Sequence, residues 1–138
     1  MTQKLGIGFV AYSPLGRGFL SGRMNGTEAL AEGDFRRANP RFQSENMAHN
    51  MGLLDTVRDV AARYEAAPGQ VALAWLLAQS EHIVPIPGTR RSAYLRENLA
   101  AAKLVLAASD LALLSAAMAP ESVHGARYGR EGMQGINA

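Results

Sequence analysis

The stretch Ala11-Tyr-Ser-Pro-Leu-Gly-Arg-Gly-Phe-Leu-Ser-Gly22 decides how the rest of this chain is interpreted. It continues from a short apolar run, residues 7–11, which predicts a buried β-strand. Pro14, Gly16 and Gly18 predict a loop directly after that strand. Glycines let a backbone approach a ligand closely, and successive amide groups in such a loop can face an anion. Because α/β proteins often hold phosphate groups at the carboxyl ends of their strands, the stretch predicts a phosphate-binding loop.

A second segment, Ile83-Val-Pro-Ile-Pro-Gly-Thr-Arg-Arg-Ser-Ala-Tyr-Leu-Arg-Glu-Asn98, repeats this arrangement far along the chain. Residues 83–86 predict another short strand, which Pro87 and Gly88 end. A helix is expected over residues 90–103, with Thr89 as its N-cap. The two segments together predict an α/β fold in which the loops after both strands meet at one rim.

Two arginines at the start of that helix carry the functional information. Arg90 and Arg91 fall in the first helical turn, where the helix dipole disfavours a cation by a few tenths up to about 1 kcal/mol. A bound anion reverses this sign, because helix N-termini attract phosphate. A solvated pair of arginines in a loop is the alternative that the local pattern leaves open.

The rest of the chain is predicted to be mostly helical. Residues 47–65 carry apolar side chains at helical spacing. Residues 68–79 begin with Pro68, which is favoured at the first helical position, and are apolar almost all round. A last helix is expected over residues 109–119, with Ser109 as its N-cap. These features predict helices that pack around the two strands.

Two segments lack helical periodicity. Residues 23–46 predict a long loop, either a lid over a ligand or a disordered insertion. Residues 120–138 are polar and Gly-rich and predict a loose C-terminal tail. The chain is therefore divided into one domain over residues 1–119 and this tail.

These motifs resemble those of the aldo-keto reductase family. Residues 12–22 are similar to the family's loop after the seventh barrel strand, and residues 86–98 to its eighth strand and the cofactor helix that follows. The similarity continues through residues 34–37, 39–43, 68–77 and 127–128, so it covers essentially the whole chain. It implies an α/β fold that forms the C-terminal portion of a TIM (β/α)8 barrel, strands 7 and 8 with their helices. His124, Arg127 and Tyr128 of the tail would then border a substrate pocket, although a solvated terminus is the simpler interpretation.

The resemblance also implies a nicotinamide nucleotide site that prefers NADP(H) to NAD(H). In the family the first loop lies over the pyrophosphate, the helix start takes the adenosine 2′-phosphate, and one side of the helix contacts the adenine. The matching residues are Ser13, Leu15, Gly16 and Arg17 for the pyrophosphate, Gly88, Thr89 and Arg90 for the 2′-phosphate, and Tyr94, Glu97 and Asn98 for the adenine. Tyr94 stands where many members have an arginine, so adenine stacking is available there while Arg90 and Arg91 replace the charge.

No catalytic residue is assigned to this chain. Family members reduce aldehydes or ketones to alcohols with an Asp, Tyr, Lys and His group on earlier barrel strands, and nothing here matches that group. Tyr12 belongs to the phosphate-loop motif. The implied function is therefore the cofactor-binding half of an NADPH-dependent reductase of small carbonyl substrates, inactive by itself. The alternative is a truncated family member that serves as a non-catalytic nucleotide-binding or assembly module.

Composition excludes several other classes of protein. The chain has 138 residues, enough for one domain, whereas a complete barrel needs about 250. A net charge of +2 with scattered arginines gives no sign of nucleic-acid binding. The chain has no cysteine and no metal-ligand spacing, so neither a disulfide nor a metal site is expected. No stretch has the length of a membrane span, and a cytoplasmic location is expected.

Two strands leave unpaired edges, because closing a barrel needs more of them. The free chain is therefore expected to be marginally stable and to bind NADPH weakly. Self-association and pairing with an N-terminal half are the two arrangements that would cover the sheet.

Overall fold

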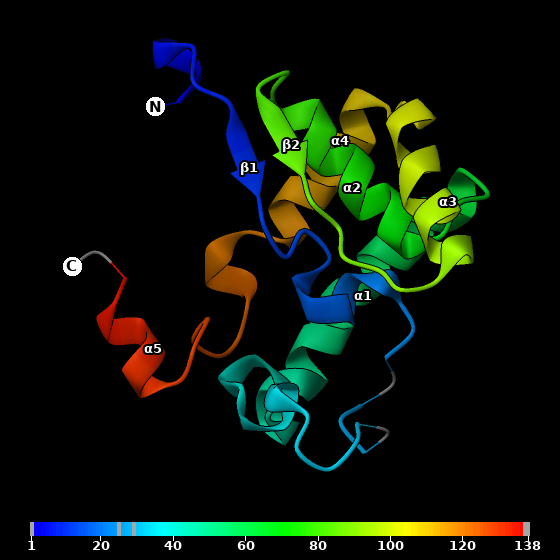
Figure 1. Cartoon of the computed structure of the whole chain (residues 1–138). Helices are drawn as coiled ribbons and strands as arrows, with labels where there is room; N and C mark the ends of the chain where they lie inside the picture. The colour runs from blue at the N-terminus through cyan, green and yellow to red at the C-terminus, as the bar shows by residue number, and fades with distance from the viewer. Residues whose placement is uncertain (1, 25, 29, 137–138) are drawn as a thin grey trace.

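The computed structural model describes residues 2–24, 26–28 and 30–136 of the chain (Figure 1). Helices dominate, which confirms the prediction of a mostly helical chain. The elements, in chain order, are β1 Phe9–Ala11, α1 Ser44–Arg63, α2 Pro68–Gln79, β2 Ile83–Pro85, α3 Ser92–Ala100, α4 Ala108–Ala117 and α5 Arg130–Gln134. None of the helices in these described ranges is long and apolar enough to cross a membrane.

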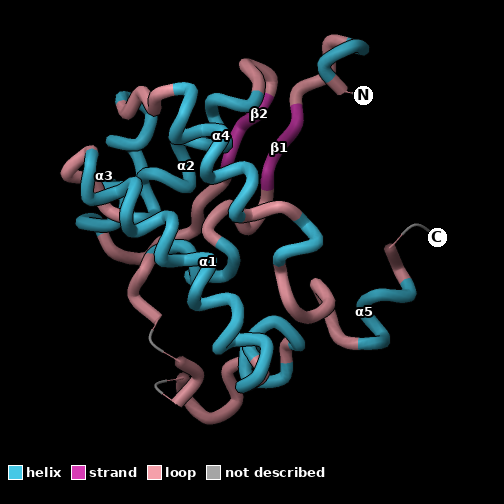
Figure 2. Tube along the Cα trace, turned by 180° about the vertical axis from the view of Figure 1, so that it is seen from behind, coloured by secondary structure: helices cyan, strands magenta, loops and turns pink. Residues whose placement is uncertain are grey.

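The two strands form a parallel pair. Phe9 lies opposite Ile83, and Ala11 lies opposite Pro85. Parallel strands need a crossover connection, and here α1 and α2 provide it. Seen from behind, the strands run side by side next to α2 and α4 (Figure 2). Because the strands are parallel, their carboxyl ends lie at the same edge, and the loops that follow them start there together.

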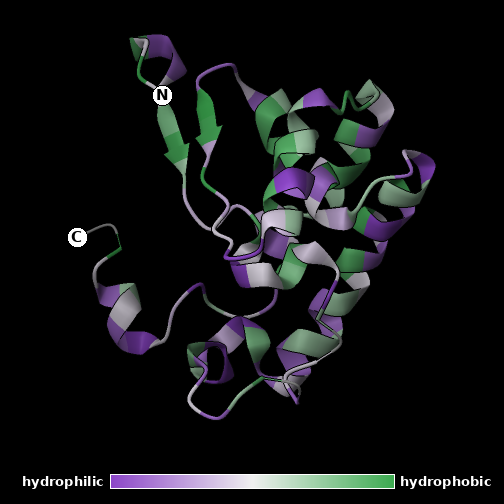
Figure 3. Cartoon of the chain, turned by 45° about the vertical axis from the view of Figure 1, so that its right-hand side comes forward, coloured by the Kyte–Doolittle hydropathy of each residue, from purple (hydrophilic) through white to green (hydrophobic). Residues whose placement is uncertain are grey.

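The expected burial of the first strand is wrong. Phe9 is 49% exposed and Val10 is 59% exposed, and Val84 of β2 is 54% exposed. In Figure 3 the hydrophobic strands stand apart from the helical layer, with one side open. Parallel strands become buried when helices or further strands cover both of their faces, and here α2 packs against β2 while Phe9 and Val10 of β1 stay about half exposed.

The hydrophobic core lies between the helices. Leu54, Val57 and Val60 of α1 are at most 2% exposed and pack against Val71 of α2 and Leu114 of α4. Their spacing of three residues places them on one face of α1. This core fixes α2, and α2 in turn contacts β2 and α3, so the helical layer positions both loops.

The boundaries of α1 and α4 differ from the expectation. α1 begins at Ser44, three residues early, because residues 35–42 already form two short 3₁₀ helices that lead into it. The Asp34 and Asn39 side chains cap these turns by accepting backbone N–H groups two residues on. Ser109 lies inside α4 and is not its N-cap. The residues 23–46 are therefore only partly a loop.

The predicted loose tail is also wrong, because residues 122–128 dock against α1 and the 3₁₀ turns. The Asn50 side chain donates to the His124 carbonyl at 3.0 Å and accepts the His124 N–H at 2.9 Å. Gly125 has φ +88°, and a Cβ there would lie 2.8 Å from the Pro40 carbonyl, so this close approach needs glycine. The Asn39 side chain donates to the Arg127 carbonyl at 3.2 Å. The tail is held by its backbone, and its short helix α5 lies beyond this docked part.

Candidate functional site

The loop after β1 folds back on itself through left-handed residues. Gly16, Arg17 and Gly18 have φ values of +56°, +59° and +93°. Glycine adopts this region freely, whereas a non-glycine residue such as Arg17 is strained by it. The Ser21 hydroxyl donates to the Gly18 carbonyl at 2.6 Å and closes the turn. The loop therefore presents a compact, fixed run of backbone at the carboxyl end of the strand.

The loop after β2 ends differently from the prediction. Helix α3 begins at Ser92, and its N-cap is Arg91. Thr89 is not the N-cap, because its hydroxyl accepts the Arg91 N–H at 3.2 Å and forms a separate turn before the helix. Arg90 lies in that turn and is exposed. No side chain caps α3, so the N–H groups of its first turn have no side-chain partner.

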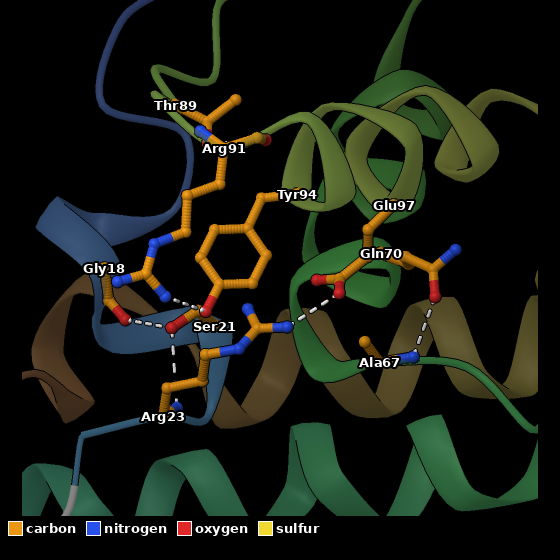
Figure 4. A network of polar contacts seen from close by, with 9 residues as sticks. All are labelled: Gly18, Ser21, Arg23, Ala67, Gln70, Thr89, Arg91, Tyr94 and Glu97. Carbon is orange, nitrogen blue, oxygen red and sulfur yellow. Dashed lines mark hydrogen bonds and ion pairs between the residues drawn. The ribbon is translucent and has the colours of Figure 1, made fainter.

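Arg23 joins the two loops. Its guanidinium forms an ion pair with Glu97 at 2.6 Å and lies 4.2 Å from the centre of the Tyr94 ring (Figure 4). The hydrogen bond to Glu97 raises the pKa of Arg23. Arg91 adds a second contact to Tyr94, by donating to its hydroxyl at 3.2 Å. The loop after β1 and the start of α3 are thus held side by side at one rim.

Sequence reasoning missed Arg23, although it found the residues that Arg23 contacts. The residue lies in a segment without periodicity, and its only signal is its position directly after Gly22. Arg23 contacts two of the residues expected at the adenine, Tyr94 and Glu97. The Glu97 carboxylate already has a cationic partner, and guanidinium groups already lie over the Tyr94 ring.

Other predicted residues are placed around this contact. Leu15 and Glu97 both lie within 3.8 Å of the Cβ position of Gly69, at the start of α2, so the two segments meet there as well. Asn98 is half-buried on α3, and Gly88 has open space around its Cβ position. The loop, α2 and α3 thus form one wall.

Arg17 behaves differently from its neighbours in the loop. Its guanidinium donates to the Arg127 carbonyl at 3.1 Å and lies 5.0 Å from the centre of the Tyr128 ring. The side chain is therefore directed to the tail and away from α3, while Ser13 is exposed at the start of the loop. Across the described ranges, no cluster of three potential metal ligands occurs.

Comparison with known proteins assigns the family. The model of the aldo/keto reductase family matches residues 1–119. The chain belongs to this family. Among curated aldo-keto reductases, it is 45% identical over 122 residues to the NADP(+) aldo-keto reductase yakc of Schizosaccharomyces pombe, which covers 88% of this chain and 36% of that protein.

Two further relatives and one solved structure agree with this assignment. The chain is 35% identical to the aldo-keto reductase str7 of Strobilurus tenacellus, over 99% of this chain and 41% of that protein. It is 40% identical to the probable aldo-keto reductase 1 of Glycine max, over 93% of this chain and 37% of that protein. A thermostable aldo-keto reductase crystallised with the inhibitor epalrestat superimposes with a TM-score of 0.56 and 29% identity, over 84% of this chain and 31% of that one. The chain thus spans about two fifths or less of the length of these aldo-keto reductases.

Proposed function

We propose that this chain forms the NADP(H)-binding wall of an aldo-keto reductase that reduces aldehydes or ketones to alcohols. Its two strands would be the seventh and eighth of the barrel, with residues 1–119 as the barrel portion and the rest as the tail. The order β1, α1, α2, β2, α3 supports this, because both loops start from the carboxyl edge of a parallel pair. The observation that carries the proposal is the Arg23 contact, which holds the loop after β1 against α3.

The residues at this rim suit a phosphorylated nucleotide. The uncapped first turn of α3 offers N–H groups, and Thr89, Arg90 and Arg91 lie directly before it. We assign the 2′-phosphate to Gly88, Thr89 and Arg90, and the adenine to the side of α3 that carries Tyr94, Glu97 and Asn98. The backbone of the loop from Ser13 to Arg17, with its left-handed turn, would lie against the pyrophosphate, since the Arg17 side chain is directed elsewhere.

The chemistry is divided between this chain and the rest of the reductase. When bound, the nicotinamide cofactor supplies the hydride. The residues described here would hold its adenosine end and orient it along the rim, while the groups that act on the carbonyl would lie outside this chain. The same reasoning predicts that the chain by itself is inactive.

A nucleotide titration of the chain tests the binding proposal. Adenosine 2′,5′-bisphosphate carries the adenine and the 2′-phosphate, and ADP lacks the latter. We expect the bisphosphate to shift the backbone NMR signals of residues 88–98 at concentrations about tenfold lower than ADP, because a charge-assisted contact to Arg90 adds to its binding. Arg90→Ala should remove the difference, and Arg130→Ala, on the tail, should leave it unchanged. Equal binding of both nucleotides to the parent chain would contradict the 2′-phosphate assignment.

The exposure of the two strands supports a second proposal, that other strands cover the sheet. Val10 and Ile86 are each more than half exposed. We propose that further strands, from an N-terminal half of the same barrel, pack there. Adding such a half should give NADPH-dependent reduction of a carbonyl substrate. If the assembled protein bound NADPH and reduced nothing, the non-catalytic nucleotide-binding or assembly module would be the better description.

A further inference from the structure

A concave region adjoins the loop after β1. Its volume is about 440 Å³, and the loop, α1, α2, α4 and the docked tail enclose it. None of residues 88–98 lines it, so it lies apart from the start of α3, and it shares Ser13, Gly16 and Arg17 with the loop described above. Its interior is mostly apolar, and the apolar side chains that line it include Phe19, Leu53, Val57, Trp75, Leu114 and Met118.

Every charged side chain that lines this pocket is an arginine. The three are Arg17, Arg41 and Arg127. Arg17 donates to the Arg127 carbonyl at 3.1 Å, and Arg41 donates to the Gly125 carbonyl at 3.2 Å. The Arg127 guanidinium lies 4.8 Å from the centre of the Tyr12 ring. In the described part of the chain none of the three has a carboxylate within ion-pair distance.

This arrangement places like charges together in a partly desolvated space. Burial lowers the pKa of Arg41, and the charges of Arg127 and Arg17 lower it further. A guanidinium carries five N–H donors, so each of these arginines keeps donors beyond the contacts described. An anion at this point would offset the repulsion between the arginines and accept hydrogen bonds from those donors.

We infer that the pocket binds an organic anion, a carboxylate with an apolar body. Its acid group would lie against Arg17, Arg41 and Arg127, and its apolar part would lie along Leu53 and Trp75. An apolar pocket with a few converging polar groups is the usual form of a small-molecule site. The inference goes beyond the proposed nucleotide site and does not depend on it.

Trp75 makes the inference measurable, because it is the only tryptophan in the chain and it lines the pocket. Decanoate and 1-decanol have the same apolar chain and differ in the charged head. We expect decanoate, below its micelle concentration, to change Trp75 fluorescence in a saturable way. Decanol should bind about tenfold more weakly or less, because it lacks the charge-assisted hydrogen bonds. Added salt should weaken the binding of decanoate and leave the binding of decanol unaffected.

Variants identify the groups that recognise the acid. Arg127→Gln should lower decanoate affinity about tenfold, and the Arg127 guanidinium contacts the Tyr12 and Tyr128 side chains, which are not part of the helical core, so the fold should be kept. Arg41→Lys should give a smaller loss of decanoate affinity, because lysine keeps the positive charge and lacks only the paired N–H donors of the guanidinium. Arg130→Gln removes an arginine outside the pocket and should change nothing. Equal affinity for acid and alcohol, an unaffected Arg127→Gln, or no fluorescence change would each overturn the inference. Arg90→Ala should not alter decanoate binding, which separates this result from the nucleotide proposal.

Discussion

At the scale of single residues, Arg23 is the link between two segments that are far apart in the sequence. It contacts α3 through both a carboxylate and an aromatic face, at 2.6 Å from Glu97 and 4.2 Å from the centre of the Tyr94 ring. The Arg23 side chain is 43% exposed, so its ion pair alone contributes about 0.2–1 kcal/mol to stability. The ring contact contributes about 0.5–1 kcal/mol more at such a site. Arg23 therefore matters more for holding the loop after β1 against α3 than for the stability of the fold.

Arg23→Ala tests that role. We expect the variant to bind adenosine 2′,5′-bisphosphate about three- to tenfold more weakly, because the loop after β1 is no longer held against α3. The midpoint of urea unfolding should change little. NMR titration and urea unfolding measure the two effects. Arg37→Ala removes an exposed arginine from the same segment and should leave both the affinity and the unfolding midpoint unchanged. If Arg37→Ala weakened binding equally, the loss of positive charge alone would explain the effect of Arg23→Ala.

Asp34 gives a prediction for acid pH. The Arg36 side chain and then the Arg36 N–H lower the pKa of the Asp34 carboxyl from 3.8 to about 2. Because the folded value is the lower one, the ionised carboxylate stabilises the turn over residues 34–38 above about pH 4, and this contribution is lost as pH falls towards 2. A carbon-detected NMR titration of Asp34 should give a midpoint near the lower value. In Arg36→Leu the midpoint should move back towards 3.8, and an unchanged midpoint would contradict the assignment.

At the scale of elements, the sequence predicted correctly those boundaries that residues close by in the chain determine. Helix α2 has the predicted bounds, because Pro68 begins it and the Gln70 side chain accepts the Ala67 N–H to cap it. The start of α3 was wrong by two residues, since Thr89 serves its own turn. The docked tail was missed because backbone carbonyls and asparagine amides hold it, and these leave no periodic pattern. The rim contact was expected from the motifs, but the direction of Arg17 depends on that unpredicted tail.

Asn50 is the residue on which the docked tail depends most. It is 4% exposed, and its side-chain amide contacts His124 in both directions and donates to the Arg41 carbonyl. Asn50→Ala should cost about 1–3 kcal/mol of stability, because it leaves buried backbone groups without partners. Urea unfolding measures the loss, and limited proteolysis should cut residues 122–130 sooner. Asn46→Ala removes a hydrogen bond from the Asn46 amide to the Pro40 carbonyl. This bond does not involve the tail, so the variant should not speed that cleavage.

At the scale of the whole molecule, the open side of the sheet is the feature that local patterns could not predict. An apolar run indicates a strand, but its exposure depends on neighbours, and residues 7–11 carry the same pattern whether covered or open. Two strands form a marginal sheet by themselves. An exposed apolar edge is also a template for pairing with another chain.

The exposed sheet predicts that the chain associates with itself as its concentration rises. Sedimentation velocity should show a growing fraction of larger species, because burying Val10 and its neighbours removes apolar surface from water. Val10→Lys should shift the distribution back to the monomer, since a lysine on an edge strand opposes pairing. Val105→Lys is the matched control, because Val105 is 86% exposed in the turn before α4 and lies outside the sheet. If both lysines acted alike, charge alone would explain the change, and if the parent chain stayed monomeric throughout, the sheet would not be an association surface.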